Sequence, residues 1–316
     1  MRRPLYIGTL AAAALLIIAI MAVALESIAP GDFPLNTVVK IPVGATLSQS
    51  AALLHDDGLI RSEFMYKIYA TLLGGTSGVK SGAYLFVSPQ SALKVASRVV
   101  HGDSGIPPIK VFIFEGADTA DMAKSLAKAI PGFSAKDFLV LAKPHEGYLF
   151  PDTYYFTADD TPASVVKVML TAFDGKTAPL AGQIASSHRT LSDIVNMASI
   201  VEKEATSSAD RRMIAGILWK RLGAGMALQV DPPFYYILDT TSALTLDDLR
   251  TVSPYNLYQN KGLPPTPIDS PGLAAIEDTL APMASPYWFY LSGRDGRMHF
   301  ATTLDGHIAN IQKYLN

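Results

Sequence analysis

One short segment of the chain combines a carboxylate, a glycine and a cluster of aromatic residues. Glu146 and Gly147 stand directly before the aromatic residues of 148–156, which Pro151 and Asp152 interrupt. A carboxyl group near apolar rings is desolvated, and desolvation favours its neutral form. A neutral glutamic acid can give its proton to a leaving oxygen, as a general acid does. Glu146 is therefore a catalytic candidate; the alternative is a surface glutamate that starts a turn at Pro151 and Asp152.

A second carboxylate, Glu202, falls on the apolar face of a predicted helix. Hydrophobic periodicity predicts this helix over 191–205, with Thr190 as its N-cap and Asp193 completing a capping box. A carboxylate that points at a core without a partner is costly to bury. Glu202 must therefore either pair with an arginine from elsewhere or line a site. Lys203 is expected on the opposite, polar side of the helix, where it is a poor partner for Glu202.

Two proline-rich loops follow this helix, at 228–233 and 253–268. They contain Gln, Asp, Asn and Tyr, the residue types that hydrogen-bond sugar hydroxyls and acetamido groups, and proline holds such loops at low entropic cost. Ordinary turns have a similar composition. Taken alone, these loops leave saccharide binding and a purely structural role equally open.

Composition removes several classes of function. The chain has 26 Lys plus Arg against 28 Asp plus Glu, and no basic run longer than the pair Arg2-Arg3, so nucleic acid is not an expected partner. Cysteine is absent, which excludes disulfides, thiolate metal sites and a cysteine nucleophile. The six histidines lack the spacing of zinc ligands, and the chain has no glycine-rich phosphate loop. Neither a metal nor a cofactor is expected.

The beginning of the chain has the pattern of a membrane anchor. Residues 4–25 carry no charge and are rich in Ala, Leu and Ile, and about 20 such residues suffice for a helix to cross a bilayer. Arg2 and Arg3 precede this stretch and Glu26 follows it, so the positive-inside rule places the N-terminus in the cytoplasm and the remainder outside. The alternative is a cleaved signal peptide, whose apolar region is usually shorter.

The rest of the sequence predicts two α+β domains. Gly, Asp, Ser and two prolines between 101 and 108 sustain neither helical nor strand periodicity and indicate a linker. The predicted order is a cytoplasmic tip at 1–3, a transmembrane helix at 4–25, linkers at 26–36 and 104–108, a small α+β module at 37–103 and a larger mixed α+β domain at 109–316. Strands are predicted at 38–42, 81–87 and 111–114, and helices at 46–57, 64–72, 89–100, 120–130 and 134–141.

The larger domain resembles the YceG-like (MltG) family of endolytic murein transglycosylases over nearly its whole length. Four blocks match the family in the same order: 146–154, 198–204, 228–232 and 253–271. Within these blocks, Val230, Pro233, Leu257 and Thr266 depart from the family pattern, which affects saccharide contacts rather than the acid. The small module is similar to the LysM-like module of the family, mainly through residues 43–47.

The resemblance implies a site and a reaction. It makes Glu146 the catalytic acid of an enzyme that cuts peptidoglycan glycan strands. The family residues carried over as candidate walls of the cleft are Glu202, Glu204, Gln229, Asp231, Tyr255 and Asn256. Of these, Glu202, Gln229 and Asn256 are expected to steady the positive charge or the N-acetyl group of the sugar. The single N-terminal anchor of the family agrees with the anchor predicted at 4–25, and thus with a single-pass protein of the bacterial inner membrane whose catalytic domain lies in the periplasm. Anchoring near the membrane suggests action on nascent strands, with peptidoglycan synthases as partners.

The expected reaction is that of a lyase that needs one carboxyl group. Glu146 would protonate the oxygen between N-acetylmuramic acid and N-acetylglucosamine, and then take a proton from the muramic acid 6-hydroxyl, which closes a 1,6-anhydro ring. A hydrolytic muramidase is a competing hypothesis; it needs a second carboxylate, for which Asp152 and Asp231 are candidates. The other is a non-catalytic scaffold that binds the wall and recruits synthases.

Overall fold

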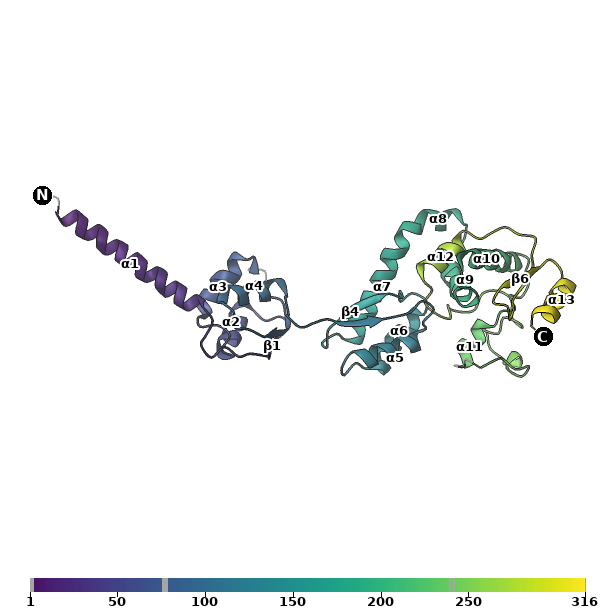
Figure 1. Ribbon diagram of the computed structural model, residues 1–316, viewed down its shortest axis with the longest axis horizontal. Helices are drawn as coiled ribbons and strands as arrows, with labels where there is room; N and C mark the ends of the chain where they lie inside the picture. The colour runs from purple at the N-terminus through teal and green to yellow at the C-terminus, as the bar shows by residue number, and fades with distance from the viewer. Residues whose placement is uncertain (1–2, 76–78, 239, 241, 316) are drawn as a thin grey trace. The chain divides into compact units, whose positions relative to one another are not determined.

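The computed structural model describes residues 3–75, 79–238, 240 and 242–315, with backbone alone for 3–11 (Figure 1). The chain divides into two compact units, Met1–Pro108 and Ile109–Asn316. Each unit mixes short two-stranded antiparallel sheets with helices. The predicted α+β class is therefore confirmed, and the two units are described separately below.

The N-terminal unit begins with a long helix, α1 (Arg3–Ser27). Residues 12–26 of this helix are all exposed, including the large apolar side chains of Leu15, Ile18 and Met21. Within the described residues, none of the helices combines the length and hydropathy needed to cross a membrane. The predicted transmembrane segment, 4–25, includes residues 4–11, whose side chains lie outside the described residues.

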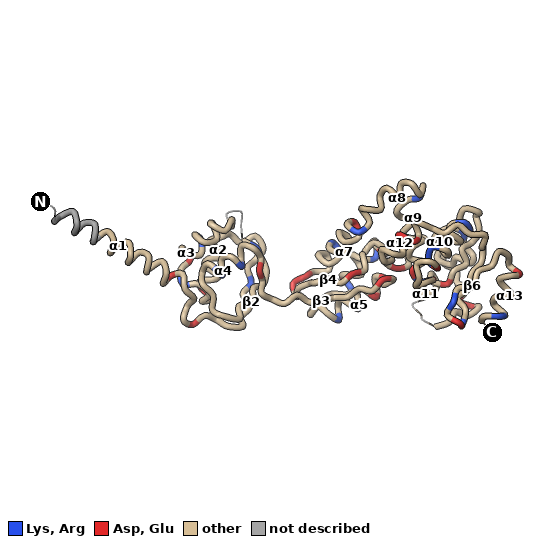
Figure 2. The backbone as a smooth tube through the Cα atoms, turned by 45° about the horizontal axis from the view of Figure 1, so that its top comes forward, with Lys and Arg blue, Asp and Glu red and all other residues tan. Residues whose placement is uncertain are grey.

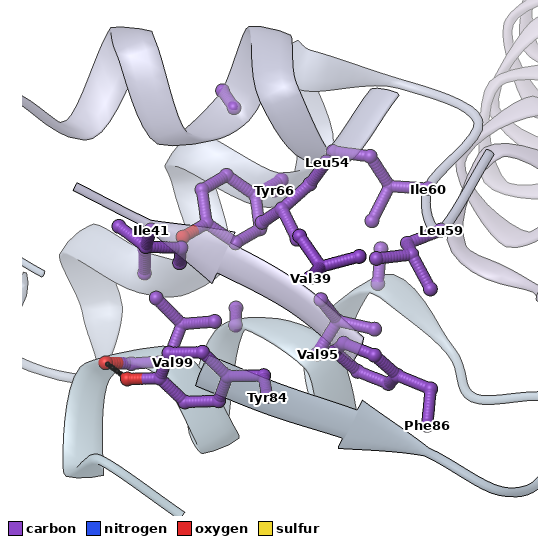
Figure 3. Close-up of a cluster of buried hydrophobic side chains, with 14 of the residues drawn as sticks. Val39, Ile41, Leu54, Leu59, Ile60, Tyr66, Tyr84, Phe86, Val95 and Val99 are labelled. Atoms are coloured by element: carbon purple, nitrogen blue, oxygen red, sulfur yellow. Dashed lines mark hydrogen bonds between the residues drawn. The ribbon is translucent and has the colours of Figure 1, made fainter. Parts of the chain in front are cut away.

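The rest of this unit is a two-stranded antiparallel sheet covered by three helices. Strands β1 (Thr37–Ile41) and β2 (Gly82–Phe86) pair antiparallel along their full length. The helices are α2 (Leu47–Asp56), α3 (Glu63–Leu72) and α4 (Ala92–His101). Figure 3 shows side chains from both strands, such as Val39 and Phe86, packed against Leu54 and Val95 of the helices. The helices bury the side chains of this short sheet, so the unit has a hydrophobic core of its own.

The C-terminal unit starts with a second two-stranded sheet and the helices that cover it. Strand β3 (Ile109–Phe112) pairs antiparallel with β4 (Thr153–Phe156). Between and after them lie α5 (Thr119–Ala129), α6 (Ala135–Ala142), the short 3-10 helix η2 (Lys143–His145) and α7 (Pro162–Thr177). Buried side chains of β3, α5, α6, β4 and α7 form one core. Asp118 and Ser134 cap α5 and α6, so both helices begin where a side chain can satisfy a free amide.

The second half of this unit surrounds one buried helix, α9 (Leu191–Glu204). Around it are η3 (Ala178–Leu180), α8 (Ala181–Ser186), α10 (Ser208–Gly223), α11 (Pro232–Leu238), η4 (Asp248–Arg250) and α12 (Leu273–Leu280). Helices α10, α11 and α12 all contact α9, as Figure 1 shows for α10 and α12. The unit ends with the β5 (Phe289–Ser292) and β6 (Met298–Ala301) hairpin and α13 (Leu304–Tyr314).

Helix α9 confirms one prediction and corrects another. Thr190 and Asp193 form the expected capping box. The helix does not have one apolar and one polar face, because every residue from 194 to 201 is buried. Its buried polar side chains bond to the following loop: the Asn196 amide donates to the Pro264 carbonyl (2.6 Å), and the Ser199 hydroxyl accepts from the Ile268 amide (3.1 Å). Helix α9 therefore holds the 264–268 loop in place.

Candidate active site

A sharp turn presents Glu146 to the interior of the C-terminal unit. Glu146 ends η2, and Gly147 follows with φ of +86°, a conformation that favours glycine. A Cβ at Gly147 would collide with the Pro267 side chain and lie 3.3 Å from the Asp269 carbonyl oxygen. Glycine is thus required here on two grounds, and it lets the Glu146 turn pack closely against the loop that α9 holds.

Four hydrogen bonds surround the Glu146 carboxylate, whose residue is only 2% exposed. The Thr119 amide donates to Oε1 (3.0 Å), and the Thr119 hydroxyl donates to Oε2 (2.8 Å). Lys143 Nζ (3.0 Å) and the Tyr236 hydroxyl (3.2 Å) also donate to Oε2. Because Thr119 is the first residue of α5, its amide is one that the helix leaves free, and the carboxylate lies at the positive end of the helix dipole.

Burial raises the pKa of Glu146 above its usual value. The hydrogen bonds and charge of Lys143 and the bond from Thr119 act in the opposite direction, while the negative charge of Asp118 adds to the rise. The net direction is upward, so the site favours the protonated acid more than water does. Burial also raises the pKa of Tyr236, to about 12, so this phenol remains a donor.

All but one of the aromatic residues that follow Glu146 in sequence pack into the core; Tyr155 is exposed. Tyr154 and Phe156 belong to the β3–β4 core, whereas Phe150 packs with α9 and α12 residues. The aromatic group that touches Glu146 is Tyr236, from α11, and Lys143 Nζ lies 4.5 Å from the centre of its ring. The predicted rise of the Glu146 pKa is therefore found, but the ring in contact comes from a distant part of the chain.

Tyr236 also lines a cavity of about 470 Å³. We call it the first cavity; its lining residues are Gly116, Asp118, Asp121, Lys124, Lys203, Pro232, Tyr235, Tyr236, Thr240 and Ile268. The Tyr236 hydroxyl, which donates to Glu146 Oε2, joins Glu146 to the wall of this cavity. Acidic and basic residues are mixed along the C-terminal unit (Figure 2).

Glu202 lies near the first cavity and holds the beginning of α12. Its Oε2 accepts a hydrogen bond from the Gly272 amide (3.0 Å), and Gly272 is the N-cap residue of α12. Burial raises the pKa of Glu202, and the charge of Glu115 adds to the rise. The positive charge of Arg211 lowers the pKa of Glu202, but Arg211 forms its ion pair with Asp278 (2.8 Å). Glu202 is thus partnered by a helix N-terminus rather than by an arginine.

Lys203 and Asp269 form a second charged group at the first cavity. Lys203 Nζ donates to the Gly116 carbonyl (2.6 Å) and lies 3.9 Å from Asp269 Oδ2. Asp269 is fully buried, and neither carboxyl oxygen has a hydrogen-bond partner among the described residues. Burial raises the pKa of Asp269 well above its usual value. Lys203 is exposed, as predicted, and forms no ion pair with Glu202 among the described residues; its amine lies along the wall of the first cavity.

Two loop candidates, Tyr255 and Asn256, have different positions. The Tyr255 ring packs against Tyr236, with centroids 5.4 Å apart, and its hydroxyl bonds to the Thr266 hydroxyl (2.7 Å). Asn256 is fully buried, and its amide donates to the Leu249 and Thr251 carbonyls. Tyr255 therefore supports the tyrosine that touches Glu146, whereas Asn256 holds its own loop together.

The remaining candidates, Glu204, Gln229 and Asp231, line a different cavity of about 450 Å³. We call it the second cavity; it lies between the end of α9, β5 and α13. Asp231 accepts a hydrogen bond from the Tyr258 hydroxyl (2.7 Å) there. The structure therefore brings Glu202 and Tyr255 to the surroundings of Glu146 and places these three elsewhere.

Residues that sequence reasoning missed complete the site: Thr119, Lys143, Tyr236, Lys203 and Asp269. Lys143 had a local signal, since it precedes Glu146 by one tight turn. Thr119 and Tyr236 had none, because 27 and 90 positions separate them from Glu146. Among the described residues, no group of three or more His, Asp or Glu side chains is arranged to hold a metal ion.

The fold and the site define a mixed α+β protein in which four hydrogen bonds surround a buried glutamic acid, and one of their donors, Tyr236, lines a cavity. The chain belongs to the YceG-like family, whose model matches residues 39–313. It is 28% identical over 306 residues to the endolytic murein transglycosylase of Bacillus subtilis (strain 168), covering 88% of this chain and 84% of that protein.

Two further relatives extend the comparison. The endolytic murein transglycosylase of Streptococcus pneumoniae (serotype 2, strain D39) is 27% identical over 321 residues, which cover 88% of this chain and 58% of that protein. A crystal structure of a YceG-like protein from Listeria monocytogenes superposes with a TM-score of 0.60 at 29% identity, covering 86% of this chain and 98% of that one. Sequence and fold thus agree on the family.

Proposed function

We propose that this protein is an endolytic lytic transglycosylase of peptidoglycan, with Glu146 as its single acid and base. The observation that carries the proposal is the buried Glu146 carboxyl, whose pKa burial raises and whose Oε2 bonds to a tyrosine of the first cavity. Membership of the YceG-like family and the names of the Bacillus and Streptococcus relatives support it.

The chemistry begins with one proton. Protonated Glu146 gives it to the oxygen between N-acetylmuramic acid and N-acetylglucosamine, the C1–O bond breaks, and the N-acetylglucosamine side leaves as an alcohol. The muramic acid C1 then carries oxocarbenium-like charge. The Glu146 carboxylate takes the proton of the 6-hydroxyl as O6 bonds to C1, giving the 1,6-anhydro end. The acid is restored, and no water is consumed.

Lys143 and Tyr236 stabilise the intermediate state of Glu146. Once Glu146 has given up its proton, its Oε2 is an anion with an ammonium at 3.0 Å and a phenol at 3.2 Å. Charge-assisted hydrogen bonds are the stronger kind, and their donors are already in place. Burial favours the acid before the transfer, and these two donors favour the base after it.

The first cavity offers both kinds of surface that a sugar needs. Tyr235, Tyr236 and Pro232 present flat apolar faces, and Asp118 and Lys203 present polar groups. Its volume of about 470 Å³ lies within the roughly 300–1,000 Å³ range of small-molecule sites. We assign the sugars that flank the cut bond to this cavity.

The hydrolytic alternative receives less support. Asp152 lies 3.4 Å from Lys176 in an ion pair, and Asp231 lines the second cavity. Neither lines the first cavity, so neither is placed to activate a water beside Glu146. A scaffold without catalysis gives no reason for a buried acid with a raised pKa.

The membrane and wall setting is part of the proposal. We propose that residues 4–25 anchor the protein in the cytoplasmic membrane, with the rest on the outer side, where it ends nascent strands beside their synthases. The exposed apolar side chains of α1 support this, because soluble proteins rarely expose so many together. We further propose that the LysM-like unit at 37–103 binds glycan.

The test compares the full-length protein with Glu146→Gln on purified peptidoglycan, with products identified by mass spectrometry. Glutamine keeps the shape and cannot donate the proton. We expect anhydromuramic ends from the parent and a loss of at least about a hundredfold in the variant. An exposed glutamate, Glu277, provides the control Glu277→Gln, which should cut normally. Reducing ends would establish a hydrolase, and equal cutting by the Glu146 variant would remove this residue from the mechanism.

A further inference from the structure

The second cavity is a separate pocket within the same unit. Its volume is about 450 Å³, and its walls come from the end of α9, the 229–231 loop, β5 and α13. None of its lining residues lines the first cavity. The proposed cleavage at Glu146 therefore does not account for it.

The charges of the second cavity are unbalanced. Glu204 forms no ion pair among the described residues, and Asp231 is bonded only to the neutral Tyr258 hydroxyl (2.7 Å). The one cationic side chain among its lining residues is Arg221, which is buried and donates to the Trp288 (2.7 Å) and Leu228 (2.6 Å) carbonyls. Two carboxylates thus face a single guanidinium that the backbone already holds.

The excess of negative charge affects the pKa of Glu204. Burial, and then the negative charge of Asp231, raise the pKa of Glu204 to about 7, although Tyr290 and Arg221 act against the rise. A cation in the pocket would stabilise the charged form of Glu204 and lower its pKa, whereas an anion would raise the pKa further.

Two buried polar atoms line the same pocket. His307 Nδ1 is inaccessible to solvent and forms no hydrogen bond among the described residues, and the Tyr290 hydroxyl, also inaccessible, lies beside the Glu204 carboxyl. Burial lowers the pKa of His307, so its ring is neutral and one nitrogen can accept a hydrogen bond. Together with the Glu204 carboxylate, these atoms give three acceptors, which matches the three donors of a primary ammonium group.

We propose that the second cavity binds the free side-chain amine of the diamino acid in a peptidoglycan peptide stem. This inference rests on the proposed function only for the identity of the polymer. Peptide stems are attached to the muramic acid residues of the strand, so a stem bound here holds the strand while the first cavity binds its sugars. A neutral sugar would leave Glu204 and Asp231 uncompensated and fits the pocket less well.

The experiment measures binding of two peptides to the full-length protein by calorimetry at pH 8, above the Glu204 pKa of about 7. One is the synthetic stem L-Ala–γ-D-Glu–L-Lys–D-Ala–D-Ala, and the other is the same peptide with its lysine amine acetylated. We expect the free amine to bind at least about tenfold more tightly. Glu204→Gln should make the two affinities equal, and Glu277→Gln should leave the difference intact.

Further variants separate this proposal from the catalytic one. Glu146→Gln should keep the peptide preference, so cleavage by that variant would count against the proposed function alone. Tyr290→Phe keeps the ring and removes one acceptor; it should weaken the preference and decides the question if Glu204→Gln does not fold. Equal binding of the two peptides, no binding of either, or binding of an unsubstituted disaccharide that Glu204→Gln abolishes would overturn the proposal.

Discussion

The two oxygens of Glu146 have different surroundings. Oε1 accepts one hydrogen bond, from the Thr119 backbone, whereas Oε2 accepts three, from Thr119, Lys143 and Tyr236. Only the Oε2 group of donors includes a residue of the first cavity wall, namely Tyr236. Oε2 is therefore the oxygen we expect to exchange the proton, and Oε1 the one that fixes the carboxyl on α5.

Lys143→Met tests how the ammonium tunes this acid. Lys143 lowers the pKa of Glu146 through its hydrogen bond and its charge. Without it the Glu146 pKa rises further, so the acid stays protonated to higher pH. We expect the alkaline limb of the pH–activity profile to shift upward, while kcat falls about tenfold because the carboxylate loses a donor. Anhydro-end formation is measured across pH.

The control for this variant is Lys128→Met, on the exposed side of α5. It removes the same charge from a residue far from any described contact of Glu146, so its pH profile should match that of the parent. A downward shift of the alkaline limb in Lys143→Met would contradict the role given to the ammonium.

The sequence alone could identify only those residues of the site that lie close to Glu146 in the chain. Glu146 stood out by its own segment, and Lys143 is within the same turn. Thr119 and Tyr236 come from other elements, and only the packing of α5 and α11 brings them to Glu146. Glu204, Gln229 and Asp231 were grouped with Glu146 through family blocks, whereas the structure gives them a cavity of their own.

At the scale of elements, the helix starts were the best predicted features. Ser134 and the Thr190–Asp193 capping box act locally, so the sequence alone suffices to place them. The burial of α9 on every side could not be predicted, because it depends on α10, α11 and α12 closing around it. The single apolar face expected for this helix was wrong for the same reason.

Gly147→Ala tests the contact between the Glu146 turn and the 264–269 loop. The added methyl would meet the Pro267 side chain, and the φ of +86° is itself unfavourable for alanine. We expect the free energy of unfolding to fall by roughly 2 kcal/mol or more and activity to fall further as Glu146 leaves its donors. Thermal unfolding and anhydro-end assays measure both.

A matched glycine is Gly132, which has φ of +74° but open space at its Cβ position. Gly132→Ala carries the backbone cost alone, so it should destabilise less and leave cleavage unchanged. If the two variants behave alike, the close packing at Pro267 is not what requires glycine at 147.

At the scale of the whole molecule, two units with separate cores share one chain. The family match, 39–313, extends across both units. The core of the N-terminal unit begins at Phe33, so α1 contributes exposed apolar surface rather than core. The α+β class of both units was predictable from periodicity and composition.

Removal of residues 1–26 tests the membrane anchor. The full-length protein should sediment with membranes and resist extraction by alkaline carbonate, because an inserted helix is released only by detergent. The shortened chain should remain in the supernatant with its thermal midpoint nearly unchanged. Release of the full-length protein by carbonate would contradict insertion of α1.

The two cavities meet at a single peptide bond. Asp231 lines the second cavity and Pro232, the next residue, lines the first. Their Cα atoms are about 3.8 Å apart, as across any trans peptide, so we expect a ligand that shifts this point in one cavity to act on the other. Linkage is reciprocal: whatever factor a bound stem applies to saccharide affinity, the saccharide must apply to the stem. If both proposals hold, we expect the peptide stems of a strand to influence the proposed cutting site through this bond.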